Sequence, residues 1–446
     1  MKIIIAGAGE VGTYLAKMLS IESHEILVID TDKDRLNNLD SHLEVMTLHG
    51  SSASIEALHD AEISKADLFI CVTPTEELNI TSAMLAKKMG AKKTIARIDS
   101  PEYLKASNKD IFKEMGIDSL IYPEQLAAKE VVDLLSQAGT TEVVNFSGGK
   151  LMLMVVKLDE NAPIINKTLL NAAMMNADLD YRAVAITRNG ETLVPRGNDV
   201  FRVGDVAYVI TTQAGVSRLL RFSGKQNIHI KNIMIVGGSR IGASTARVLQ
   251  HKNNIKLIEI DRDKSFKLAD ELEKTMVIRG NGSESDLLVE EGIREMDAFI
   301  AVTGNSETNI LSCLQAKKLG VKKTIAEVEN IEYIRLAENI GIDSMINKKF
   351  IAASHIFGFT MNAQISSVKC LTGTDAEVIE IKPNEGSEIT KAPLKELDFP
   401  HMAIVGGVIR NKSGFIARGS THIRTTDKVI IFTLPSIIPK VEKFFK

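Results

Sequence analysis

The sequence lacks most of the residues from which catalytic and metal centres are built. Its 446 residues include no tryptophan, three cysteines and nine scattered histidines. The three cysteines show neither zinc-type spacing nor a disulfide framework, which favours a reducing compartment. We find no H-x-x-x-H or HExxH pattern, nucleophile elbow, kinase signature or Walker lysine. The sequence therefore indicates no metal site and no catalytic residue.

Long apolar runs and an excess of one charge are missing as well. The formal net charge is −3, which supplies no general attraction to nucleic acid or anionic lipid. No apolar run reaches the roughly 18 residues needed to cross a bilayer. The opening stretch MKIIIAGAGE runs directly into glycines and predicts a first β-strand, not a secretory signal. We expect a cytoplasmic protein that binds no nucleic acid and does not insert into the membrane directly.

What the sequence has is a long internal repeat. The segment AKKMGAKKTIAR at 86–97 returns as AKKLGVKKTIAE at 316–327, an offset of 230 residues. The same offset carries GAGEVG (7–12) onto GGSRIG (237–242). Solenoid units are only about 20–50 residues long, so this period indicates a duplicated pair of domains. The repeated glycine-rich segments are of the type that binds nucleotides, and two such sites without a catalytic cluster favour a sensor over an enzyme.

Within each copy, short apolar strands alternate with amphipathic helices, a pattern typical of βαβ units and a buried parallel sheet. A smaller segment with strand-like alternation follows in each half. The fold class predicted is α/β, with two Rossmann-like doubly wound parallel-sheet domains, each followed by a small α+β domain. The predicted parts are a large domain at 1–122, an exit helix at 123–139, a small domain at 140–224, a large domain at 231–347, an exit helix at 348–364 and a small domain at 366–446, with a linker at 224–232. The apolar stripe of the first exit helix indicates either ordinary core or a contact with a partner subunit.

The first copy carries a dinucleotide-binding pattern. Gly7, Gly9 and Gly12 form G-x-G-x-x-G between a predicted strand and a predicted helix. Such glycines allow a tight turn, close approach of a pyrophosphate and close packing of helix on strand. Asp30 ends the next strand 18 residues after Gly12, close to the ~20-residue spacing at which a carboxylate meets ribose hydroxyls. A carboxylate there repels a 2′-phosphate, which favours NAD(H) over NADP(H).

Three more residues lie at the ends of later strands, where open α/β sheets place ligands. Thr73 and Pro74 follow the fourth strand, and Thr73 either faces the ligand or caps the next helix. Arg97 lies near the end of the fifth strand, where it could bind a phosphate or form a surface ion pair.

The second copy departs from this pattern. Ser239 stands where the second glycine of the motif belongs, and Glu327 replaces the arginine. Asp261, 19 residues after Gly242, is the carboxylate expected to take the part of Asp30. The second site is either a nucleotide site with other preferences or a degenerate structural copy.

These motifs together resemble the TrkA family, the peripheral subunits of Trk potassium-uptake systems built from paired regulator-of-potassium-conductance (RCK) domains. The resemblance rests on IIIAGAGEVG, VIDTDKDRL, VTPTEELN and IARI followed by SPEY in the first copy, on VTGNSETN in the second, and on the fourfold alternation of large and small domains. It implies large nucleotide-binding domains and small C-terminal ligand-binding modules. The residues it assigns to nucleotide binding are Gly7, Ala8, Gly9, Glu10, Val11, Gly12, Asp30, Thr73, Pro74 and Arg97 in the first copy and Gly237, Gly238, Ser239, Arg240, Ile241, Gly242, Asp261 and Thr303 in the second.

The resemblance implies a regulator without a reaction of its own. It would bind NAD(H) or ATP/ADP, assemble as a homo-oligomeric ring, and gate a Trk-type membrane potassium-transporting subunit from the inner face of the cell membrane. Two alternatives stay open: an NAD-dependent oxidoreductase, and a nucleotide-sensing regulator of a different cation channel or antiporter. Against the first, residues 140–225 offer no convergent His, Lys or Tyr cluster to act beside a nicotinamide.

Overall fold

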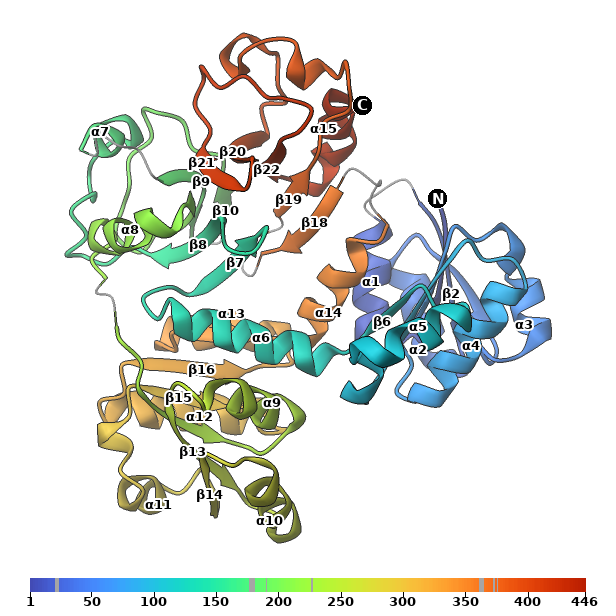
Figure 1. The fold of residues 1–446 in the computed structure, drawn as a ribbon, viewed down its shortest axis with the longest axis horizontal. Coiled ribbons are helices and arrows are strands. Elements are labelled where there is room, and N and C mark those ends of the chain that lie inside the picture. Colours follow the sequence, from blue (N-terminus) through green and yellow to red (C-terminus); the bar gives the residue numbers. More distant parts are fainter. Residues whose placement is uncertain are drawn as a thin grey trace. The chain divides into compact units, whose positions relative to one another are not determined.

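The computed structural model describes residues 1–20, 24–175, 181–189, 191–225, 228–360, 365–371, 374 and 376–446. The end of the predicted second exit helix (361–364) and two residues of the predicted linker (226 and 227) lie outside the described residues. The chain forms two compact units (Figure 1), of which unit 1 comprises residues 1–126 and 348–362 and unit 2 comprises 127–347 and 363–446.

Unit 1 is built on a six-stranded parallel sheet of order β3-β2-β1-β4-β5-β6. Apart from Lys2, its central strands are apolar and buried, as a sheet covered on both faces requires. The strand order reverses between β1 and β4, which creates the crevice where such sheets bind ligands. The strands are β1 (Lys2–Ala6), β2 (Glu25–Asp30), β3 (Met46–His49), β4 (Leu68–Cys71), β5 (Lys93–Arg97) and β6 (Ser119–Ile121).

The helices of unit 1 include one that comes from a distant part of the chain. Helix α14 lies alongside α1, orange beside blue in Figure 1, although more than 300 residues separate the two in sequence. The other helices are the βα crossovers that a parallel sheet requires. The helices are α1 (Glu10–Ser20), α2 (Lys33–His42), α3 (Ile55–Asp60), α4 (Glu76–Lys88), α5 (Ala106–Glu114) and α14 (Lys348–Phe357).

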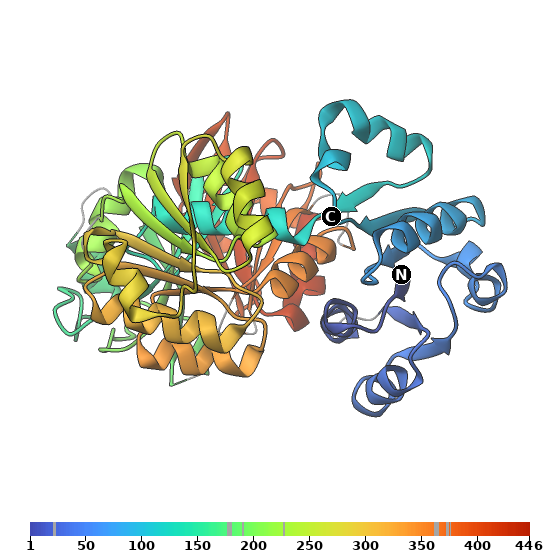
Figure 2. The same cartoon turned by 90° about the horizontal axis from the view of Figure 1, so that it is seen from below.

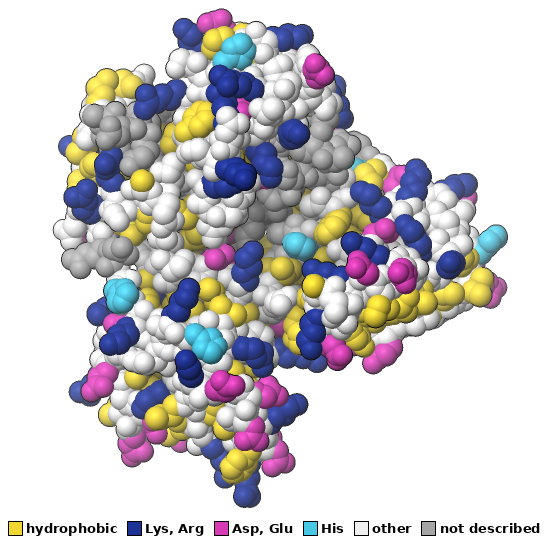
Figure 3. All heavy atoms as spheres, viewed as in Figure 1, with side chains coloured by type: hydrophobic (Ala, Val, Ile, Leu, Met, Phe, Trp, Pro, Cys, Tyr) yellow, Lys and Arg dark blue, Asp and Glu magenta, His cyan; other side chains and the backbone are white. Residues whose placement is uncertain are grey.

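Unit 2 contains the second large domain, whose parallel sheet has the matching order β14-β13-β12-β15-β16-β17. Figures 1 and 2 show helices on both faces of this sheet. In Figure 3 acidic and basic side chains are intermixed over this domain. Its elements are β12 (Asn232–Val236), α9 (Arg240–Leu249), β13 (Asn254–Glu259), α10 (Arg262–Glu271), β14 (Thr275–Arg279), α11 (Ser285–Glu290), β15 (Ala298–Ala301), α12 (Ser306–Lys318), β16 (Lys323–Glu327), α13 (Ile331–Ile340) and β17 (Ser344–Ile346).

Both small domains also belong to unit 2, and each has a five-stranded antiparallel sheet. The orders β10-β9-β11-β8-β7 and β21-β20-β22-β19-β18 are the same topology, strand for strand. The first small domain contains β7 (Glu142–Phe146), β8 (Leu151–Lys157), α7 (Leu169–Met174), β9 (Tyr181–Arg188), β10 (Glu191–Leu193), β11 (Val206–Thr211) and α8 (Val216–Phe222). The second contains β18 (Ile365–Cys370), β19 (Glu377–Ile381), β20 (Ala403–Arg410), β21 (Ser413–Ile416), β22 (Lys428–Thr433) and α15 (Ile438–Phe445).

The two small domains share one hydrophobic core. Tyr208 of the first and Phe432 of the second are both almost fully buried, with ring centroids 6.2 Å apart. Arg182 reaches across to donate a 2.8 Å hydrogen bond to the carbonyl of Ala417. At Gly406 an added Cβ would collide with the side chain of Ile210, so the sheets approach closely there. The small domains therefore pack as one body inside unit 2.

The predicted fold class is confirmed: two Rossmann-like sheets, each followed by a small α+β domain. The exit helix of the first half, α6 (Pro123–Ser136), passes from unit 1 into unit 2. Its predicted apolar stripe is buried within this chain, with Ala127, Val131 and Leu134 at most 1 % exposed. These side chains are core, which is the first of the two readings that the sequence left open.

Candidate functional site

The glycine loop of unit 1 connects β1 to α1 in the conformation that the motif predicts. Gly7 has φ +109°, a backbone region that favours glycine, and its N–H donates to the Ile29 carbonyl at 2.8 Å. A Cβ on Gly12 would collide with the Gly7 carbonyl oxygen, so only glycine lets α1 pack this closely. Above Gly9 the nearest atom to an added Cβ is a guanidinium nitrogen of Arg35, 3.9 Å away. The loop therefore leaves room for a ligand at Gly9.

Asp30 links the loop to the end of β2. One carboxylate oxygen accepts the N–H of Ala8 at 2.5 Å, and the other accepts the N–H of Asp32 at 2.8 Å. Asp30 is half-buried, so the remaining lone pairs can accept from ribose hydroxyls. Asp32 is the N-cap of α2 and accepts from the backbone of Asp34 and Arg35. The structure thus holds Asp30 in place and gives Asp32 a helix-capping position.

The ends of β4 and β5 are joined by Asn79, a residue that the site prediction did not include. Its side-chain oxygen accepts from the Thr73 N–H at 2.9 Å and from the Thr73 hydroxyl at 2.6 Å. Its amide nitrogen donates to the carbonyls of Thr73 and Arg97, both at 3.0 Å. Asn79 is 1 % exposed, and Pro74 beside Thr73 is exposed. The sequence signal was present, since asparagine closes both VTPTEELN and VTGNSETN.

Arg97 is paired inside unit 1. Its guanidinium lies 3.3 Å from a carboxylate oxygen of Asp99 and 4.0 Å from one of Glu124. The Glu76 carboxylate accepts the backbone N–H groups of Asp99 and Ser100, which holds this acidic turn in place. To bind a phosphate in bidentate fashion, Arg97 would have to leave Asp99. The structure shows the ion pair, one of the two roles that the sequence allowed.

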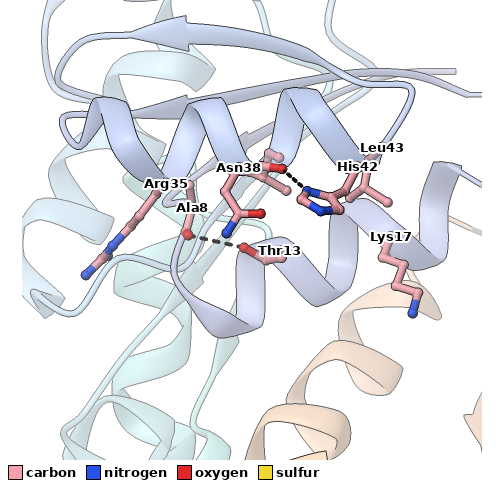
Figure 4. Close-up of a pocket in the computed structure, with 8 residues that line it drawn as sticks. Ala8, Thr13, Lys17, Arg35, Asn38, His42 and Leu43 are labelled. Carbon is pink, nitrogen blue, oxygen red and sulfur yellow. Dashed lines mark hydrogen bonds between the residues drawn. The ribbon is translucent and has the colours of Figure 1, made fainter.

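A cavity of about 410 Å³ opens beside the glycine loop, between α1 and α2. In Figure 4 Thr13 and Lys17 come from α1, whereas Arg35, Asn38 and His42 come from α2. The Thr13 hydroxyl donates to the Ala8 carbonyl at 3.2 Å, and a ring nitrogen of His42 lies 2.8 Å from the Asn38 carbonyl. Of the lining residues, the sequence prediction contained only Ala8. The lining residues are Ala8, Thr13, Lys17, Arg35, Asn38, Leu39, His42 and Leu43.

Arg35 is the most significant residue that the prediction missed. It lies nearest the open space above Gly9, and its Nε is 3.2 Å from the Asp32 carboxylate. A guanidinium beside a glycine loop supplies positive charge where a pyrophosphate would approach. Arg35 lies in the first turn of α2, and the packing of α2 beside the loop places its guanidinium near Gly9.

The second glycine loop has the same backbone but less free space. Gly237 has φ +101°, and a Cβ on Gly242 would collide with the Gly237 carbonyl. The Ser239 hydroxyl caps α9 by accepting the Gly242 N–H at 3.3 Å. A Cβ on Gly238 would collide with the side chain of Leu268. Arg240 and Ile241 open the helix, and Ile241 is 1 % exposed.

The pairing of Asp261 with Asp30 is corrected by the structure, which places Glu259 at that position. Glu259 accepts the N–H groups of Gly238 and Asp261, both at 2.9 Å, as Asp30 accepts those of Ala8 and Asp32. Asp261 instead caps α10. Helix α9 has 10 residues and α1 has 11, so the offset falls from 230 to 229 before β13.

The Glu259 carboxylate also forms an ion pair with a lysine. The Lys264 ammonium lies 2.9 Å from its carboxylate, and the Glu259 side chain is 5 % exposed. Burial works to raise the pKa of Glu259, but hydrogen bonds from the Asp261 N–H and Lys264 outweigh it and hold the pKa below 4.5. The carboxylate is therefore ionised and already satisfied by the protein. The second copy keeps the hydrogen bond between Thr73 and Asn79 of the first, because the Thr303 hydroxyl donates to the Asn309 side chain at 2.7 Å.

Comparison with known proteins matches both large domains and one small domain. The TrkA-N domain matches residues 3–123 and 233–348, and the TrkA-C domain matches 153–224. The Trk system potassium uptake protein TrkA homolog of Archaeoglobus fulgidus is 33 % identical over 449 residues, covering all of both chains. The Trk system potassium uptake protein TrkA of Haemophilus influenzae is 31 % identical over 452 residues, covering all of this chain and 99 % of that protein.

Solved structures share the fold. The chain is similar to the GsuK channel bound to NAD, with a TM-score of 0.60, 15 % identity, and coverage of 100 % of this chain and 78 % of that one. It is equally similar to the GsuK RCK domain, with a TM-score of 0.60, 15 % identity, and coverage of 99 % and 94 %. No helix among the described residues is both long and apolar enough to span a bilayer. From the duplicated fold and the full-length relatives, we conclude that the chain belongs to the TrkA family of Trk potassium uptake systems.

Proposed function

We propose that the chain is the nucleotide-binding regulatory subunit of a membrane potassium uptake transporter, and that its first large domain is the one that senses the nucleotide. The observation that carries the proposal is the contrast between two equivalent carboxylates. Among the described residues, Asp30 is half-buried and bonded only to backbone N–H groups, whereas Glu259 is nearly buried and also bound by Lys264. The Asp30 carboxylate can exchange solvent for ribose hydroxyls, whereas the Glu259 carboxylate already has its hydrogen-bond and ion-pair partners within the protein.

The ligand class is an adenine nucleotide with a diphosphate. Asp30 supports NAD(H) or ADP/ATP over NADP(H), because a 2′-phosphate would meet a carboxylate. The space above Gly9 and the nearby Arg35 guanidinium suit a pyrophosphate. Of the solved structures with this fold, one holds NAD and another, covering 80 % of this chain with a TM-score of 0.51, holds ADP. This likeness supports the ligand class.

Regulation by small ligands requires several sites to act together. Moving a gate from 1:99 to 99:1 needs about 5.5 kcal/mol of differential binding. Four equivalent chains in a ring would each need only ~1.4 kcal/mol, a tenfold affinity difference between the two states. We therefore propose a homo-oligomeric ring at the inner face of the membrane, bound to the potassium-transporting subunit.

Calorimetric titration of the full chain with NADH, ADP and ATP tests the binding site. We expect one nucleotide per chain. Asp30→Asn should weaken binding by about tenfold to a hundredfold, because a hydrogen bond to a charged group contributes about 1.5–3 kcal/mol. Glu259→Gln, the same change at the equivalent position of the second copy, should leave the affinity within about twofold because that carboxylate is not expected to meet the ligand. Two nucleotides per chain, or equal losses in both variants, would contradict the proposed assignment.

Potassium flux tests the regulatory role. The chain should co-purify with the membrane subunit, and flux into vesicles that contain both proteins should change on addition of nucleotide and not in Asp30→Asn. The oxidoreductase alternative makes the opposite prediction, namely steady consumption of NADH with ketones or 2-oxo acids. Co-purification with an unrelated antiporter would identify the other alternative.

A further inference from the structure

The first glycine loop receives a cation from the second half of the chain. Lys349 is the second residue of α14, and its ammonium forms an ion pair with Glu10, the first residue of α1. One helical turn along α1, Tyr14 meets Phe350 edge to face, with ring centroids 4.3 Å apart. Both contacts lie within unit 1. The two aromatic rings hold α14 so that Lys349 stays at the N-terminal end of α1.

Glu10 is an unfavourable residue for an anion-binding loop. The first backbone bond of α1 runs from the Thr13 N–H to the Gly9 carbonyl, so the N–H groups of Glu10, Val11 and Gly12 come before it. These groups and the helix dipole attract phosphate, whereas the Glu10 carboxylate repels it. Lys349 neutralises this carboxylate, and its side chain is 17 % exposed against 67 % for Glu10. The balance of charge at the loop therefore depends on a residue of the second half.

We propose that Lys349 is the residue that distinguishes nucleotides by their number of phosphates. Without ligand its ammonium pairs with Glu10, and with a triphosphate it pairs with the terminal phosphate instead. This inference rests on the proposed function, because it concerns the same nucleotide site. Since α14 continues directly from β17 of the second large domain, the exchange of partner also links the ligand to the second half of the chain.

The environment of Lys349 supports this role. Burial lowers the pKa of Lys349, so a strongly anionic partner such as a phosphate stabilises its charged form. ATP brings one more phosphate than ADP, and its terminal phosphate carries the charge that an ammonium binds as a point charge. NADH has no terminal phosphate and leaves the Glu10–Lys349 pair intact. The three ligands should therefore differ in how much the Lys349 ammonium contributes to their affinity.

Titration of four variants with ATP, ADP and NADH tests the proposal. In Lys349→Met we expect ATP to lose at least about tenfold more affinity than ADP or NADH, the effect of one charged hydrogen bond. Lys349→Arg keeps the charge and should preserve the ratio of ATP to ADP affinity. Lys348→Met removes a positive charge one residue earlier on α14 and should also preserve it. Glu10→Gln should strengthen binding of all three ligands, and of ATP most.

Hydrogen exchange of residues 348–357 gives an independent readout, because ATP should change their protection and NADH should not. If wild type and all variants bind no nucleotide, the proposed function fails and this inference fails with it. If wild type binds nucleotide but Lys349→Met loses all three ligands equally, or keeps the wild-type ATP to ADP ratio, Lys349 has only a structural role. In that case this inference alone is overturned.

Discussion

The strongest physical prediction concerns Lys323, a lysine that is completely buried in unit 2. Its ammonium donates to the carbonyl of Thr140 at 2.5 Å and to the hydroxyl of Ser344 at 2.8 Å. Thr140 follows α6, so this side chain ties the exit segment of the first half to the second large domain. The change that we propose is Lys323→Met, which keeps an unbranched apolar stem and removes the charge.

The size of the expected change in folding stability follows from the pKa of Lys323. Burial lowers the pKa of Lys323 from 10.5 to about 8, against a raising effect of Asp343. Between pH 8 and 10.5 the unfolded chain binds the proton and the folded chain has released it, so stability rises with pH. The shift corresponds to about 3 kcal/mol over that window, at ~1.4 kcal/mol per pKa unit. Below pH 8 Lys323 is protonated in both the folded and the unfolded chain, so it no longer makes the free energy of unfolding depend on pH.

Urea unfolding followed by circular dichroism at pH 7 to 10.5 measures the effect, since the chain has no tryptophan to report on it. The wild type should gain about 3 kcal/mol relative to Lys323→Met as pH rises from 8 to 10.5. Lys93, the equivalent residue of the first copy, is exposed, so Lys93→Met should run parallel to wild type. Parallel curves for wild type and Lys323→Met would refute the reasoning, because they would mean that the buried amine keeps its ordinary pKa.

Two further predictions concern residues of the glycine loops and strand ends. Asn79→Ala leaves the Thr73 N–H and the Arg97 carbonyl without their partner, and should lower the free energy of unfolding by about 2–4 kcal/mol. Thermal unfolding should detect this loss. An Asn79→Ala protein with an unchanged melting temperature would show that the hydrogen bonds of the Asn79 side chain do not stabilise the fold. Ser239→Ala removes the N-cap of α9 and should cost about 1 kcal/mol without changing nucleotide stoichiometry. Calorimetry checks the second point, and a newly occupied second site would contradict it.

Much of the first site was predictable because its determinants are local. The glycine turn, the helix start at Glu10 and the carboxylate at the end of β2 lie within about 24 residues of one another. The second site shows how such reasoning fails. Because α9 is one residue shorter than α1, Asp30 corresponds to Glu259 and Asp32 to Asp261, and counting residues along the sequence does not detect this. Only the register of β13 beside β12 identifies the correct residue.

Contacts between distant segments were not predictable at all. Arg35 reaches the space above Gly9 because α2 packs beside the loop, and Lys349 reaches Glu10 because α14 leaves the second half to pack on α1. The sequence pattern of α14 indicates a helix with an apolar face, and it does not specify which surface that face covers. The location of both exit helices is therefore information from the tertiary structure.

The repeated segment shows where the division lies. By itself the sequence determined that 86–97 and 316–327 form the same helix, turn and strand, because periodicity and glycine placement act over a few residues. It could not determine that Lys93 is exposed whereas Lys323 is buried under Thr140. Burial depends on which distant segment covers a residue, and at Lys323 this covering lowers the pKa of the ammonium.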